Sequence, residues 1–237
     1  MAATNKFLKM KKLSSLSVIY PVFNDSYSLS QLIKKTVGFL PFVANEYEII
    51  IVNDGSNDKT TKILLNKFEE KIPFLRVFNH EQNLGYGAAL VTGFAKAKSD
   101  FIFYTDSDGQ YDPLELKKLV VEFNDKVDLV TGFKLNRADP WFRRISGFFY
   151  NNFVKILFNL KVRDVDCDFK LFRRSLLQGL TLKVTSGAFD VDFIKKLQQK
   201  KVRFREVPVH HYKRQYGKSQ FFSFLNIARS LFDLTKI

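Results

Sequence analysis

The chain has 237 residues, of which 46% are hydrophobic and 26% are charged, with a net charge of +14, 26 phenylalanines and one cysteine. This balance is typical of a globular chain and argues against disorder, and a single cysteine excludes an internal disulfide. The excess of Lys and Arg indicates an anionic partner, and the phenylalanine content indicates apolar surface beyond the needs of a core.

The sequence contains no run of 18 apolar residues; the nearest approach, 145–160, is interrupted by two asparagines and a lysine. We therefore expect no membrane-spanning segment, and the basic start of the chain lacks the apolar stretch of a signal peptide. We expect Cys167 to be a small buried side chain in a protein of a reducing compartment. His80, His210 and His211 are expected to be satisfied loop residues and not metal ligands.

Strands and helices alternate through the first half of the chain. Apolar runs bounded by turn residues predict strands, and helical periodicity between them predicts helices. This β-α repetition predicts a mostly parallel sheet flanked by helices. The predicted strands are 16–20, 47–52, 75–79, 101–105 and 128–131. The predicted helices end near Gly38, Lys71 and Lys98, and a further helix has Pro113 in its first turn. We expect Ser56 or Asn57 to cap the helix that ends near Lys71.

The second half has a different pattern. Residues 141–160 and 221–234 each have Phe and Leu side chains on one helical face, which predicts two amphipathic helices. Between them we predict strands at 169–172 and 202–209 and a helix at 188–199. No linker is evident, so we predict a single domain over 1–237, with a flexible basic N-terminus at 1–15 and an amphipathic C-terminal helix at 221–237.

Residues 101–110 read FIFYTDSDGQ and combine a buried strand with a cluster of oxygen ligands. Asp106 and Asp108 follow the strand directly, and Gln110 adds an amide oxygen. Ligands of open α/β sheets bind at the carboxyl ends of the strands. Carboxylates at that place suit Mg²⁺ or Mn²⁺ held together with a diphosphate, although a D-x-D alone also fits a solvated acidic turn.

Two further polar turns follow neighbouring predicted strands. They are Asn24-Asp25 and Asn53-Asp54, and parallel strands bring their carboxyl ends to one edge of a sheet. We therefore expect both turns to lie beside Asp106 and Asp108. Such a rim is what a cation-assisted nucleotide site needs.

Four segments in this order resemble glycosyltransferase family 2: VIYPVFND, IIIVNDGSND, NLGYGAAL and DSDGQ. The chain is most similar to the polyprenyl-phosphate glycosyltransferases, the group of dolichyl-phosphate mannose synthases and undecaprenyl-phosphate sugar transferases. The resemblance runs from Leu16 to about Gln220. It implies a GT-A fold and an inverting, metal-dependent transfer of a sugar from a UDP- or GDP-linked donor to a polyprenyl phosphate.

The resemblance also implies roles for single residues. It assigns the catalytic work to Asp106, Asp108, Arg144 and Arg214, with Arg143 as an adjacent rival of Arg144. The implied nucleotide-sugar contacts are Pro21, Phe23, Asp25, Asp54, Asp106 and Ser107; the implied ligands of Mg²⁺ or Mn²⁺ are Asp106, Asp108 and Gln110; the implied acceptor-phosphate contacts are Lys134, Arg144, Arg214 and Ser219.

Five positions depart from the usual residues of the family. At these positions Asp25 replaces the usual Glu, Asn53 replaces Asp, Lys134 replaces Arg, Asp168 replaces Gly and Gln220 replaces Lys. Lysine keeps the charge of arginine but loses its bidentate fork. Asp168 would either add charge near the acceptor or be an unremarkable loop side chain, and we favour the second interpretation.

A lipid phosphate is already anionic at neutral pH, so its transfer needs no general base. Transfer to a sugar hydroxyl, the main alternative, would need a carboxylate base, for which Asp164, Asp166 and Asp168 are candidates. A basic nucleic-acid-binding protein is a remote alternative, because the cations form no single run. The sugar, the nucleotide base and the lipid length stay open.

Residues 141–160 and 221–234 also bear on location. Aromatic faces with cationic flanks suit helices that lie in a membrane interface. We therefore expect a cytoplasmic protein bound peripherally to the anionic, cytosolic face of a membrane. The alternative is that both faces pack on the sheet or on a partner subunit, which leaves a homo-oligomer open.

Overall fold

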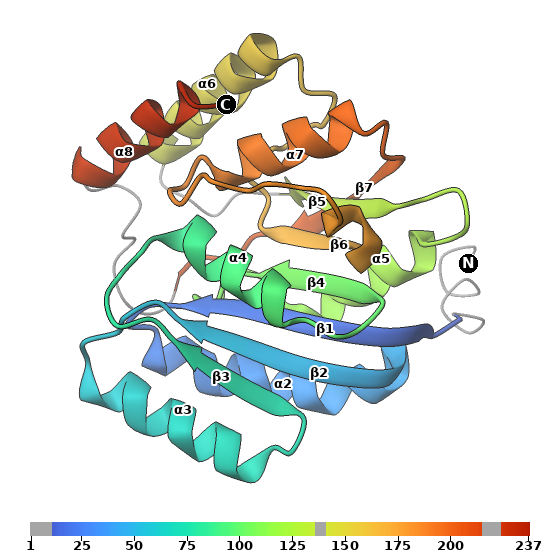
Figure 1. Ribbon diagram of the computed structural model, residues 1–237, viewed down its shortest axis with the longest axis vertical. Helices are drawn as coiled ribbons and strands as arrows, with labels where there is room; N and C mark the ends of the chain where they lie inside the picture. The colour runs from blue at the N-terminus through green and yellow to red at the C-terminus, as the bar shows by residue number, and fades with distance from the viewer. Residues whose placement is uncertain (1–10, 136–140, 215–223) are drawn as a thin grey trace.

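The computed structural model describes residues 11–135, 141–214 and 224–237 (Figure 1). Its centre is a seven-stranded sheet in the order β3-β2-β1-β4-β6-β5-β7. Every strand predicted from the sequence is present. The strands are β1 (Leu13–Val22), β2 (Ala44–Asn53), β3 (Leu75–Asn79), β4 (Phe101–Thr105), β5 (Leu129–Leu135), β6 (Phe169–Arg173) and β7 (Phe204–His210).

The sheet is mostly parallel, as predicted. Strand β1 runs parallel to both β2 and β4, β2 to β3, and β5 to β7. Strand β6 is antiparallel to β4 and to β5 and lies between them. Because of this reversal, the beginning of β6 lies at the same edge as the carboxyl ends of β4 and β5. Strand β1 also begins at Leu13, inside the segment expected to be flexible.

Helices cover both faces of the sheet (Figure 1). Alternation along the strands separates two cores: Val18 and Tyr20 belong to one, Ile19 to the other. The first core is closed by α2 (Ser26–Val43), α3 (Lys59–Lys71), α5 (Leu116–Glu122) and the 3₁₀ turn Pro113–Glu115; the second is closed by α4 (Tyr86–Lys96), α6 (Trp141–Phe158), α7 (Phe189–Gln199) and α8 (Phe224–Leu234), with a 3₁₀ turn at Arg174–Leu177 beside them.

The start of α3 corrects one expectation. Asp58 caps this helix by accepting a 2.7 Å hydrogen bond from the Thr61 amide, so neither Ser56 nor Asn57 is the cap. Ser56 has another role: its hydroxyl accepts a 3.0 Å hydrogen bond from the Asn24 amide. The side chain expected to begin the helix therefore joins the turns that follow β1 and β2.

Helices α6 and α8 lie at one end of the molecule, next to α7 (Figure 1). Both have exposed apolar side chains. On α8 polar as well as apolar side chains face inward: Ser230 and Asp233 are 3% exposed and Leu234 is 6% exposed, whereas Phe232 is 63% exposed. The outward face of α6 is predominantly aromatic and aliphatic; it consists of Trp141, Phe142, Ile145, Phe148, Phe149, Phe153, Ile156 and Leu157. None of the helices in the described ranges is both long and apolar enough to cross a bilayer.

Candidate active site

The three polar turns predicted to share a rim do so. The Ser107 hydroxyl donates a 2.9 Å hydrogen bond to Oδ2 of Asp25, which joins the turns after β4 and β1. The amide of Asp54 donates to the Val22 carbonyl at 2.8 Å, which joins the ends of β2 and β1. The rim is thus one continuous hydrogen-bonded edge, and all the predicted donor-side residues lie on it.

Asp54 is buried on this rim and holds the loop that precedes α4. Its Oδ1 lies 2.7 Å from Nδ1 of His80 and accepts from the Leu84 amide at 2.9 Å, and its Oδ2 accepts from the Gly85 amide at 2.9 Å. His80 also contacts the Thr92 hydroxyl at 2.9 Å, so it is a satisfied loop residue, as expected. The predicted contact between Asp54 and the nucleotide base stays a prediction.

Asp108 is buried and paired with Arg214 from the loop after β7. The guanidinium donates to Oδ2 of Asp108 at 2.6 Å and lies 3.8 Å from Oδ1 of Asp25. The same loop is fastened by Gln110, whose amide side chain donates to the Tyr212 carbonyl at 3.0 Å. Arg214, predicted as an acceptor contact, therefore also reaches the carboxylates of the donor side.

The charged form of Asp106 is disfavoured in this site. Burial and the neighbouring Asp108 raise the pKa of the Asp106 carboxyl to about 8. A cation bound here would relieve this repulsion, and oxygen ligands suit Mg²⁺ or Mn²⁺. Among the described residues, no group of three or more His, Cys, Asp or Glu side chains could hold a metal ion. The two carboxylates of the D-x-D would leave most of the coordination positions of such a cation to other oxygens, such as those of a diphosphate.

Asp168 is not the unremarkable loop residue that we expected. Its Oδ1 accepts a 2.7 Å hydrogen bond from the Tyr86 hydroxyl, and burial, with Asp106 and Asp190 nearby, raises the pKa of its carboxyl well above the usual range. Beneath it the fully buried Lys170 donates to Asp190 at 2.7 Å. The expectation failed because its partners come from α4, β4 and α7, far away in the sequence.

A cavity of about 780 Å³ lies beside the end of β5, under the first turns of α6. Lys134 and Arg144, both predicted as acceptor contacts, line it. A third cation, Arg163, was not predicted; its guanidinium lies 3.9 Å from the centre of the Phe133 ring. The other lining residues are mainly apolar: Trp141, Ile145, Gly147, Phe148, Phe149, Asn151 and Asp164.

Lys134 is less accessible than its predicted role would suggest. Its side chain is 6% exposed, and its ammonium contacts the Asp166 carbonyl and lies 3.8 Å from Oδ1 of Asp164. Its contact with an acceptor phosphate stays a prediction. Ser219 and the side chain of Arg143 lie outside the part of the chain that the structure describes.

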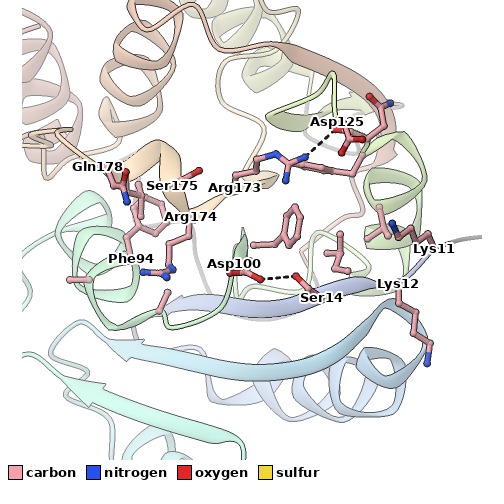
Figure 2. Close-up of a pocket in the computed structure, with 18 residues that line it drawn as sticks. Lys11, Lys12, Ser14, Phe94, Asp100, Asp125, Arg173, Arg174, Ser175 and Gln178 are labelled. Atoms are coloured by element: carbon pink, nitrogen blue, oxygen red, sulfur yellow. Dashed lines mark hydrogen bonds between the residues drawn. The ribbon is translucent and has the colours of Figure 1, made fainter.

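A second cavity, of about 730 Å³, lies at the opposite edge of the sheet (Figure 2). Ser14, Asp100, Asn124 and Arg173 are among the residues that line it. The Ser14 hydroxyl donates a hydrogen bond to Asp100 at 2.7 Å, and the Arg173 guanidinium donates to the Asn124 carbonyl at 3.2 Å. None of the predicted site residues lines it. The chemistry-bearing side chains thus gather at the carboxyl edge, where parallel sheets bind ligands.

Comparison with known proteins agrees with this geometry. The sequence model of the family described as Glycosyl transferase family 2 matches residues 17–181, more than half of the chain. The chain belongs to this family. It is a glycosyltransferase, and the matched range contains the D-x-D and Asp168 but ends before Asp190.

A curated relative of this family 2 glycosyltransferase is the undecaprenyl-phosphate 4-deoxy-4-formamido-L-arabinose transferase of Enterobacter sp. (strain 638). The two are 28% identical over 226 residues, which cover 95% of this chain and 68% of the relative. The identity is low enough that donor and acceptor are not carried over by it.

Solved structures of glucosyl-3-phosphoglycerate synthase from Mycobacterium tuberculosis share the fold. The complex with phosphoglyceric acid has a TM-score of 0.70 at 19% identity and covers 92% of this chain and 79% of that one. The complex with Mn²⁺, UDP and glucosyl-3-phosphoglycerate has a TM-score of 0.67 at 19% identity and covers 86% and 73%. The predicted GT-A fold is thereby confirmed for this family 2 member.

Proposed function

We propose that this enzyme transfers a sugar, with inversion, from a UDP- or GDP-linked donor to a polyprenyl phosphate at the cytosolic face of a membrane, using Mg²⁺ or Mn²⁺. The fold and the family do not by themselves define the donor, the acceptor, the metal or the location.

The order of polar groups along the rim supports the donor. Going from β2 through β1 to β4, the rim carries Asp54, Asp25 and then Asp106 with Asp108. A nucleoside over the first two and a diphosphate at the third fit this order, because only the third combines two carboxylates that a shared cation can bridge. The sugar would then extend toward β6 and β5.

The cavity beside β5 is the observation that carries the acceptor. Lys134, Arg144 and Arg163 contribute cations to one cavity of about 780 Å³ whose other walls are mainly the apolar side chains of α6. Cations at one part of a cavity and aromatic rings at another fit a phosphate attached to a hydrocarbon tail. The name of the curated relative, an undecaprenyl-phosphate transferase, agrees with that chemistry.

The residues would act by placing and neutralising charge. Arg144 and Arg163 hold the acceptor phosphate, whose oxygen attacks the anomeric carbon from the side opposite the diphosphate, so the configuration is inverted. The acceptor oxygen is anionic at neutral pH, and no residue has to remove a proton. Arg214 reaches the diphosphate from the loop after β7 and stabilises the leaving group. A bound Mg²⁺ or Mn²⁺ would supply further positive charge to that leaving group.

The outward faces of α6 and α8 support the location. Ile156 is 83% exposed on α6 and Phe232 is exposed on α8, while the polar Ser230 and Asp233 face inward. Contiguous exposed apolar side chains of this extent mark a membrane or protein contact surface. A polyprenyl acceptor stays in the bilayer, so a membrane contact next to the acceptor cavity suits this substrate.

The decisive experiment is a donor panel with and without acceptor. The purified protein is incubated with Mn²⁺ and radiolabelled UDP-glucose, UDP-galactose, UDP-N-acetylglucosamine or GDP-mannose. The acceptor is undecaprenyl phosphate in vesicles, vesicles without it, or a carbohydrate. Transfer of label to the lipid, dependent on the lipid phosphate, supports the proposal. No transfer from any donor to the lipid phosphate, together with transfer to a carbohydrate acceptor, would overturn it.

A second candidate, transfer to a sugar hydroxyl, rests on one carboxylate of the cavity. Asp164 lines the same cavity and could serve as a general base. However, its Oδ2 accepts a 3.1 Å hydrogen bond from the Lys134 amide and its Oδ1 lies beside the Lys134 ammonium, which weakens it as a base. Replacement of Asp164 by Asn would abolish hydroxyl transfer but leave transfer to a phosphate largely intact.

A further inference from the structure

Asp168 occupies a defined place between the donor and acceptor regions. In the antiparallel pairing of β4 with β6, Thr105 is opposite Phe169, so Asp168 comes one step later on the side of Asp106. In the pairing of β5 with β6, Thr131 is opposite Lys170, so Asp168 also faces the end of β5, where Phe133 and Lys134 follow. It therefore lies between the D-x-D and the cationic cavity.

The surroundings hold this carboxylate in a fixed position. Tyr86, the first residue of α4, donates its hydroxyl to Oδ1 of Asp168 at 2.7 Å. A hydrogen bond joins Asp168 to Asp190, which in turn accepts from Lys170 at 2.7 Å and from the Tyr104 hydroxyl at 2.5 Å. Three elements, α4, β4 and α7, thus support one side chain, which is how a recognition group is kept rigid.

We propose that Asp168 is a specificity-determining residue that accepts hydrogen bonds from hydroxyl groups of the transferred sugar. This inference rests on the proposed function. If the diphosphate binds at Asp106 and Asp108 and the acceptor phosphate binds beside Lys134, the sugar has to lie over the intervening start of β6. The strand pairing places the carboxyl of Asp168 at that point.

A carboxylate suits this task better than the glycine usual at this position. Its two oxygens have about four lone-pair directions, so they can accept from a sugar hydroxyl in addition to the Tyr86 hydroxyl and the hydrogen bond shared with Asp190. A sugar that lacks the matching hydroxyl would leave a partly buried carboxylate without that partner, and such sites discriminate strongly.

The test compares binding of sugars with binding of bare nucleotides. Wild type, Asp168→Asn, Asp168→Gly and the control Asp125→Asn, an exposed carboxylate at the opposite edge, are titrated with UDP, GDP and the four nucleotide sugars of the panel, with Mn²⁺ present. Asp168→Asn keeps the shape of the side chain, so folding is expected to survive. Tyr86→Phe keeps the carboxyl of Asp168 but removes the hydroxyl that anchors it.

We expect wild type and Asp125→Asn to share one order of preference among the sugars. In Asp168→Asn and Asp168→Gly the preferred sugar should lose about tenfold or more in affinity relative to the others, while affinity for bare UDP or GDP changes less than about twofold. Tyr86→Phe should shift the preference in the same direction by a smaller factor.

Two results would overturn the inference while leaving the proposed function intact. One is an unchanged order and spread of sugar affinities in both Asp168 variants. The other is an equal loss for bare nucleotide and nucleotide sugar, which would mean that Asp168 acts on the diphosphate through Asp106. If wild type binds no nucleotide sugar, the proposed function and this inference both fail.

Discussion

The Arg214 guanidinium lies 2.6 Å from Oδ2 of Asp108, so a side chain from the last fifth of the chain neutralises a carboxylate of the D-x-D. A divalent cation at that carboxylate would have to share it with Arg214 or displace it. Binding of the nucleoside diphosphate offers Arg214 a new anionic partner. Metal and donor are therefore expected to bind with positive cooperativity, because each favours the separation of Arg214 from Asp108.

The first prediction concerns the metal. Asp108→Asn should lower turnover by orders of magnitude, because the variant loses a carboxylate ligand and the charge that positions Arg214. Turnover with Mn²⁺ is measured for this variant and for Asp125→Asn, which should resemble wild type. Circular dichroism checks that the fold is kept. Full activity of Asp108→Asn, or undiminished wild-type activity in EDTA, would contradict a metal-dependent mechanism.

The second prediction concerns the acceptor. Arg144→Ala and Arg163→Ala should each weaken apparent affinity for undecaprenyl phosphate by about tenfold or more, since each removes a charge-assisted contact to phosphate. Binding of the nucleotide sugar should be nearly unchanged. Lys67→Ala, an exposed cation on α3, is the matched control for net charge. If acceptor affinity is unaffected by Arg144→Ala, the cavity beside β5 does not bind the phosphate.

The third prediction concerns the membrane. Ile156→Glu places a charge on the exposed face of α6 and should strongly reduce flotation of the protein with anionic liposomes. Ile63, which is 67% exposed on α3, provides the control, and Ile63→Glu should float like wild type. Equal flotation of both variants would mean that the face of α6 contacts something other than lipid.

The fourth prediction concerns the buried lysine. Lys170→Met should lower the free energy of unfolding by about 3–5 kcal/mol, because Asp190 is left as a buried charge without its partner. Arg203→Ala, which breaks the exposed pair with Asp128, should lower the free energy of unfolding far less, because exposed ion pairs contribute little. Urea unfolding of the two variants measures the difference. Similar losses would show that the Lys170 network adds little to stability.

The fifth prediction concerns pH. Burial, together with Asp164 and Asp190, raises the pKa of Asp166 from 3.8 to about 6. Between these values the folded protein keeps a proton that the unfolded chain releases, so this side chain reduces stability increasingly as the pH rises. Asp166→Asn removes that loss. The free energy of unfolding of Asp166→Asn, relative to wild type, should rise by up to roughly 3 kcal/mol from about pH 4 to pH 6 and then level off. If this difference does not change with pH, the Asp166 carboxyl is not a buried charge.

The local parts of the fold could be predicted from the sequence. The run at 101–105 is a strand because it is apolar and ends in turn residues, and the rim of β1, β2 and β4 follows from parallel pairing. The cap of α3 was missed by one or two residues, because Ser56, Asn57 and Asp58 are all good caps and their tertiary partners decide between them.

The non-local parts could not be predicted. Nothing near 169–173 indicates that this strand inserts antiparallel between β4 and β5, and the place of Asp168 follows from that insertion alone. Arg163 was missed because its contact is also non-local: it lies in the loop between α6 and β6, whereas its partner Phe133 is on β5. The amphipathic pattern of α6 predicted an apolar face correctly but could not tell whether that face points inward or outward.

The insertion of β6 also constrains the order in which the chain can fold during synthesis. The four strands β3, β2, β1 and β4 are contiguous in the sheet and precede β6 in the chain, so they can pair as soon as they have left the ribosome. Strand β4 then remains an edge strand, and β5 has no neighbour, until residues 169–173 have been made. An unpaired edge invites association with other chains, so the interval between translation of β4 and of β6 is when the nascent chain is most prone to aggregate.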